Sequence, residues 1–144
     1  MSNRAIVWVG LYVALVGMPL VVGAVWPGAA GDRAWAFQFG IGCGFTAFTL
    51  LALEFAMIAR IGPVAKAFGM DALLELHKKM GMVGVVLLGV HAVALVVAGY
   101  PAEWYNPWNE GTTWVVRWGV IAAGLLVLLV GLTAGRKALG LAYQ

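Results

Sequence analysis

The chain has 144 residues, of which 63% are hydrophobic and only 10% are charged, whereas an ordinary soluble domain is about 45 to 50% apolar and about 25% charged. This composition excludes a water-soluble globule and a disordered chain, because so much apolar surface cannot stay solvated. The formal net charge is +3, but the nine Lys and Arg residues form no basic stripe, so nucleic acid is not an expected partner. The single cysteine, Cys43, excludes an internal disulfide.

Four apolar stretches are long enough to cross a hydrocarbon core, which requires about 20 helical residues. Lipid offers the backbone no hydrogen-bond partners, so we expect each stretch to be a helix. In chain order, the expected spans are Ala5 to Trp26, Trp35 to Ile61, Asp71 to Tyr100 and Thr113 to Thr133. The sequence therefore predicts an all-α, integral membrane helical bundle surrounded by lipid, with a single domain over residues 1–144.

Loop charges predict the orientation of these helices. If the helices alternate in direction, seven of the nine basic residues lie on one side, and only Arg33 and Arg117 lie on the other. The positive-inside rule then places both termini in the cytoplasm, in a bacterial-type inner membrane. Six of the seven tryptophans favour the opposite, outer interface, where indole rings sit at the headgroup level: Trp26, Trp35, Trp104, Trp108, Trp114 and Trp118.

The two histidines of the chain, His77 and His91, both lie in the third span, fourteen positions apart. At about 100° and about 1.5 Å per residue, they point nearly the same way and stand about 21 Å apart along the helix. Imidazole is a common axial ligand of haem iron, so the pattern predicts two stacked haems that carry electrons across the bilayer. Gly84, seven residues from each histidine, would let a flat macrocycle approach the backbone. The alternative is that the histidines only bond neighbouring helices and the glycine serves helix packing.

Three other polar residues stand out, and two of them have competing interpretations. Arg60, at the end of the second span, is suited to pairing with a haem propionate, or it is an ordinary positive-inside anchor. Glu54 lies about 9 Å further into the same span, where an unpaired carboxylate is costly. We expect Glu54 to be protonated or partnered, and we favour a hydrogen bond to a neighbouring helix over proton uptake. Asp71 is expected to be the N-cap of the third span.

Four short segments around the histidines carry a resemblance to a known family. They are A-R-I-G-P at 59–63, F-G-M-D-A-L at 68–73, H-K-K-M-G at 77–81 and H-A at 91–92. Together they resemble the haem-binding transmembrane domain of the ferric reductase and NADPH oxidase superfamily, and the spacing of the two histidines is the most specific feature.

The resemblance implies two b-type haems, with His77 binding the inner haem and His91 the outer one. In that family, the second ligand of each iron is a histidine of a later helix, and the present sequence has no further histidine. We therefore expect the missing ligands from the remaining helices of a longer protein, from a partner chain, or from a second copy. FAD and NADPH are expected only through a flavin dehydrogenase domain or subunit, because the sequence contains no GxGxxG fingerprint.

These observations predict a transmembrane b-type cytochrome of the ferric reductase or NADPH oxidase type. It would pass single electrons from a cytoplasmic flavin and NAD(P)H donor to an outer acceptor such as oxygen or ferric iron. One alternative is a quinol- or flavin-fed haem subunit that serves a periplasmic reductase. An alternative of another class is a haem-free structural membrane bundle.

Overall fold

The computed structural model describes residues 3–25, 34–59 and 62–136, and every regular element among them is a helix. Four helices are long and apolar enough to cross a membrane: α1 (Asn3–Val25), α2 (Ala34–Ile58), α4 (Met70–Val97) and α5 (Trp114–Gly135). This confirms the predicted all-α class and the four spans, although the predicted ends at Trp26 and Ile61 lie outside the described residues. The side of the membrane that each terminus faces stays a prediction.

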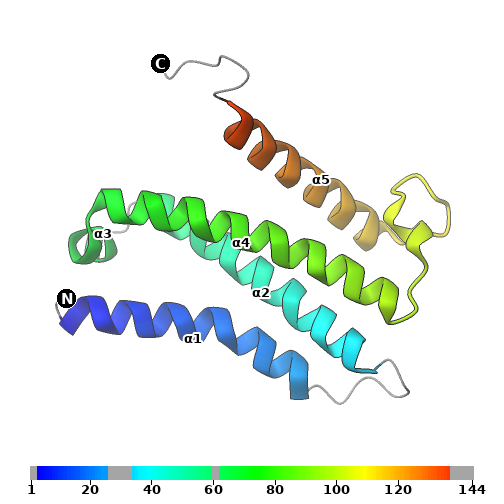
Figure 1. Ribbon diagram of the computed structural model, residues 1–144, viewed down its shortest axis with the longest axis horizontal. Coiled ribbons are helices and arrows are strands. Elements are labelled where there is room, and N and C mark those ends of the chain that lie inside the picture. The colour runs from blue at the N-terminus through cyan, green and yellow to red at the C-terminus, as the bar shows by residue number, and fades with distance from the viewer. Residues whose placement is uncertain (1–2, 26–33, 60–61, 137–144) are drawn as a thin grey trace. The chain divides into compact units, whose positions relative to one another are not determined.

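The chain divides after Gly99 into two compact units, and a single domain over residues 1–144 stays a prediction. In the first unit, α2 packs against both α4 and α1 and runs antiparallel to both, so that α1 and α4 run in the same direction (Figure 1). A short helix, α3 (Gly62–Phe68), lies at the end where α1 and α4 begin and contacts both (Figure 1). This end carries Lys66, Lys78 and Lys79, a concentration of positive charge that agrees with the predicted cytoplasmic side.

The α2 helix forms the core of this unit with small residues. Six of its buried positions alternate at intervals of four and three along the helix, as in a heptad stripe, with Gly42 and Thr46 buried beside them. The side chains of the stripe are small or of medium size: Ala36, Gly40, Cys43, Ala47, Leu50 and Glu54. Large aromatic side chains of α2 point away from this stripe, and Phe48 and Phe55 are 71% and 76% exposed. Small residues belong between membrane helices, because lipid provides no hydrophobic force and association depends on close backbone approach.

The turn between α3 and α4 depends on a glycine. The residue before α4 is Gly69, with φ 79°, and no side chain caps the helix. A side chain at Gly69 would be strained at this φ, whereas glycine adopts it freely. The predicted N-cap at Asp71 is therefore wrong: α4 begins at Met70, and Asp71 lies in its first turn. A negative charge at this position still interacts favourably with the helix dipole.

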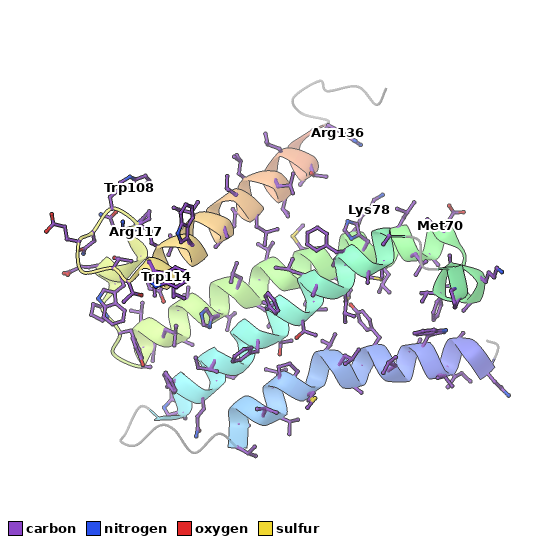
Figure 2. The ribbon with its side chains drawn as sticks, turned by 180° about the vertical axis from the view of Figure 1, so that it is seen from behind. Met70, Lys78, Trp108, Trp114, Arg117 and Arg136 are labelled. Atoms are coloured by element: carbon purple, nitrogen blue, oxygen red, sulfur yellow. The ribbon has the colours of Figure 1, made fainter. Side chains whose placement is uncertain are left out.

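The second unit contains the 3₁₀ helix η1 (Ala102–Tyr105) and α5. Its loop is held by local hydrogen bonds: the Thr112 hydroxyl donates to the Asn106 carbonyl at 3.1 Å, and Arg117 donates to the Asn109 carbonyl at 3.4 Å. Trp108, Trp114 and Arg117 gather at this end of α5, and Arg136 marks the other end (Figure 2). Exposed indole rings on an interfacial loop agree with the predicted aromatic belt.

The crossing of α1 and α2 predicts a sharp effect of one added methyl group. A Cβ on Gly23 would lie 2.8 Å from the Cα of Gly42, and backbone atoms cannot yield as a flexible side chain can. We expect Gly23→Ala to lower the free energy of unfolding by about 1–3 kcal/mol, measured by denaturant titration in mild detergent. The control is Gly17→Ala, because no atom of another described helix lies within 4 Å of a Cβ there. Equal stability of the two variants would contradict this packing.

Candidate functional site

Both histidines of α4 direct Nδ1 to acceptors on α2. In His91, Nδ1 lies 2.7 Å from the carbonyl oxygen of Gly40. A carbonyl oxygen only accepts hydrogen bonds, so the Nδ1–H of His91 must donate. In a neutral imidazole, this tautomer leaves the Nε2 lone pair free for a metal or for another donor.

A second glycine of α2 makes room for the His91 ring. A Cβ on Gly44 would lie 2.6 Å from Nδ1 and 2.9 Å from Cε1 of His91, so a larger residue would displace the ring. Sequence reasoning missed both Gly40 and Gly44. The available signal was their spacing: glycines four residues apart in a membrane helix form a small-xxx-small surface for close contact with another helix.

His77 forms its bond to a carboxyl group. Its Nδ1 is hydrogen-bonded to Oε2 of Glu54, and the Glu54 side chain is only 5% exposed, whereas that of His77 is 35% exposed. The expected hydrogen bond from Glu54 to a neighbouring helix is confirmed, and the preference for this role over proton uptake stays a prediction. The identity of its partner was not predicted. When the Nδ1–H donates to the carboxylate, His77 also keeps a free Nε2 lone pair.

The spacing of the acceptors matches the spacing of the histidines. Gly40 and Glu54 are fourteen residues apart on α2, as His77 and His91 are on α4. The two helices are antiparallel and have the same rise per residue, so one register places both acceptors opposite their histidines. The equal spacing is visible in the sequence, but it identifies Gly40 and Glu54 as partners of the histidines only when α2 and α4 are known to be neighbours.

Gly84 lies between the two histidines and faces α2. It is buried, and a Cβ on it would lie 3.6 Å from Cδ2 of Leu51, which is an ordinary contact. Helix packing is thus the role that its surroundings support, and a haem contact at Gly84 stays a prediction. Gly89, by contrast, lines an apolar groove of about 490 Å³ between α2 and α4.

The other predicted site residue, Arg60, lies outside the described residues, so its two interpretations both stay open. Of the neighbouring basic residues, Lys79 forms an exposed ion pair with Glu75 at 2.8 Å. Such an exposed pair contributes little to stability. Its exposure is what is expected of side chains on the surface of a helix near the end of a span.

Within the part of the chain that the structure describes, no three His, Cys, Asp or Glu side chains come together as a metal cluster. The two imidazoles stand on separate turns of α4, each with its own acceptor. Single imidazoles suit a metal that brings its other ligands, as haem iron does, because only axial positions are then left to the protein. The described residues therefore fit haem better than a bare metal ion.

Four apolar spans and a pair of intramembrane histidines define the class as a helical integral membrane protein. A family model, the ferric reductase like transmembrane component, matches residues 43–143. The chain belongs to this family, as the sequence resemblance indicated. Glu54, His77, Gly84 and His91 all lie within the matched region. Comparison with curated proteins and with solved structures finds no match.

The contact between Gly44 and His91 predicts a local effect that can be measured without a cofactor. In Gly44→Ala, the added methyl should push the His91 ring away and break its bond to the Gly40 carbonyl. NMR of isotope-labelled histidine in detergent should show a solvent-protected Nδ1–H of His91 in the parent protein and its loss in the variant. Gly81→Ala is the control, because a Cβ added there would have no atom of another helix within 4 Å in the described part of the chain. A protected Nδ1–H in Gly44→Ala would contradict the predicted displacement.

Proposed function

We propose that the chain is the haem-carrying electron conduit of an oxidoreductase of the ferric reductase or NADPH oxidase type. His77 and His91 would each bind one b-type haem iron through Nε2. The observation that carries this proposal is that each histidine is hydrogen-bonded through Nδ1 to a group on α2, His77 to the Glu54 carboxyl group and His91 to the Gly40 carbonyl. Metal-binding histidines almost always donate their other ring N–H to a carboxylate or carbonyl, which fixes the tautomer and the ring orientation.

The residues of this chain would set the geometry of electron transfer. Bound haem supplies reversible one-electron chemistry. The α4 helix holds the two ligands about 21 Å apart along its axis, and α2 holds their rings through Glu54 and Gly40. Arg60 is proposed to pair with a propionate at the inner site, and the apolar faces of α2 and α4 keep the conduit in a medium of low polarity.

Completion of the site requires further groups. Each iron needs a second histidine, which we assign to additional helices or to a partner chain, because the sequence holds only two. A flavin dehydrogenase domain or subunit with FAD and NADPH is the proposed donor, and oxygen or ferric iron is the proposed acceptor. With the lysine-rich end of the first unit in the cytoplasm of a bacterial-type inner membrane, electrons move outward. An inside-negative potential favours that movement by ~2.3 kcal/mol per 100 mV.

Substitution of each histidine tests the ligand assignment. We expect His77→Ala and His91→Ala each to lose one of two haems, and the two variants to lose different ones, because each ring holds a separate iron. Haem content and the absorption spectrum of the purified protein, with any partner that supplies the other ligands, measure the loss. Thr49→Ala is the control, because among the described residues the Thr49 hydroxyl bonds within its own helix, at 2.9 Å to the Phe45 carbonyl. Full haem content in both histidine variants would disprove the assignment.

The same bonds also favour a second candidate, a haem-free bundle in which the histidines only join α2 and α4. The absence of a Soret band from protein made in a haem-sufficient host would select that candidate.

If haem is present, the donor separates the remaining alternatives. Reduction that depends on NADPH and FAD is the expected result for the oxidase or ferric reductase type. Reduction by quinol without a flavoprotein would instead indicate a membrane subunit that serves a periplasmic reductase. Anaerobic absorption spectroscopy with each donor in turn distinguishes them.

A further inference from the structure

The two histidines differ in the type of group that is hydrogen-bonded to Nδ1. The partner of His77 is the carboxyl group of Glu54, whereas His91 donates to the backbone carbonyl of Gly40 at 2.7 Å. Both rings lie on α4 and both acceptors lie on α2. The sites therefore share their construction and differ mainly in whether the acceptor is a carboxylate or a neutral carbonyl.

The Glu54 carboxyl group lies where a charge has a strong effect on its neighbours. Its side chain is only 5% exposed, and no Lys or Arg of the described ranges forms an ion pair with it. Its other oxygen, Oε1, is buried and has no hydrogen-bond partner among the described side chains and backbone. Charges interact several-fold more strongly at low effective dielectric than in water.

The charge of the acceptor changes what the imidazole does to a bound iron. A hydrogen bond from Nδ1–H to a carboxylate raises the basicity of a metal-bound histidine. A more basic ligand donates more electron density through Nε2 and stabilises the ferric form over the ferrous form. Hydrogen bonding around an axial ligand is one of the means by which a protein sets the reduction potential of haem.

We infer that Glu54 is a positioning residue for His77 and gives the haem at His77 a lower reduction potential than the haem at His91. This inference rests on the proposed function, in which both histidines bind haem iron. The resulting difference favours the passage of one electron from the His77 site to the His91 site. The direction of electron flow would then be built into the two α2 acceptors.

Glu54→Gln tests the inference, because an amide oxygen still accepts the Nδ1–H but carries no charge. The matched control is Glu75→Gln. It also removes one carboxylate, close in the sequence to His77, but the Glu75 side chain is 68% exposed and paired with Lys79. Comparison of the two variants separates the effect of the buried acceptor from the effect of net charge.

The experiment is a redox titration of the haem-loaded protein, isolated with any partner that completes its haem sites and followed by its absorption bands. We expect two components in the parent protein, and the lower-potential component should be the one lost in His77→Ala. In Glu54→Gln, haem content should be unchanged and the reduction potential of this component should shift upward. The difference between the potentials of the two haems should therefore become smaller. Glu75→Gln should leave both potentials in place.

Unchanged potentials in haem-loaded Glu54→Gln would overturn the inference, as would a shift only in the component lost in His91→Ala. If Glu54→Gln loses haem, Glu54→Asp decides. If Glu54→Asp keeps the haem at His77, the result supports a carboxylate that holds the His77 ring. If Glu54→Gln and Glu54→Asp both lose this haem, Glu54 serves helix packing and the inference is overturned. A parent protein without a Soret band would instead disprove the proposed function itself.

Discussion

The close packing of α2 against α4 is the constraint on which the candidate site depends. In lipid, apolar side chains gain nothing by leaving their surroundings for another helix, so helices associate through close packing and hydrogen bonds. Glycines supply the close packing here: Gly44 receives the His91 ring, and Gly84 faces Leu50 and Leu51 of α2. Only at this separation can an imidazole of α4 reach the backbone of α2, as His91 does at Gly40.

The hydrogen bond between Glu54 and His77 reduces the cost of placing two polar groups in membrane spans. A carboxyl group within a membrane span is costly, and so is a ring N–H without an acceptor. Their hydrogen bond satisfies one polar atom on each side chain. The second ring nitrogen of His77, Nε2, remains available to a ligand. In a purely structural contact, both ring nitrogens would have partners within the protein. A hydrogen bond that serves the stability of the bundle therefore also prepares the ring for a ligand.

Hydropathy predicted the spans well, because each is long and the cost of an unpaired backbone in lipid leaves little choice. The fourth span, predicted over Thr113 to Thr133, is α5 at Trp114–Gly135. The short helix α3 was not predicted, since seven residues are too few to show a helical period. The N-cap was predicted at Asp71 by residue type alone, whereas the positive φ of Gly69 sets the start of α4.

The candidate site was predictable on α4 and not on α2. A shared face for His77 and His91 follows from helical geometry within one element. Their partners depend on which helix lies opposite and in which register, and these are tertiary properties. Glu54 was recognisable as a residue that needs a partner, but the spacing of Gly40 indicates a partner for His91 only once α2 is known to lie opposite α4.

One register serves both sites, and this links them physically. Because the acceptors and the histidines have the same fourteen-residue spacing, a shift of α2 along α4 by one turn would move both Gly40 and Glu54 away from their histidines. The geometry of the two sites is thus coupled, while the acceptors remain chemically independent: a backbone carbonyl is present whatever residue occupies position 40, but a carboxylate at position 54 depends on a side chain. A difference between the two sites can therefore arise from a single residue without disturbing the packing that aligns them.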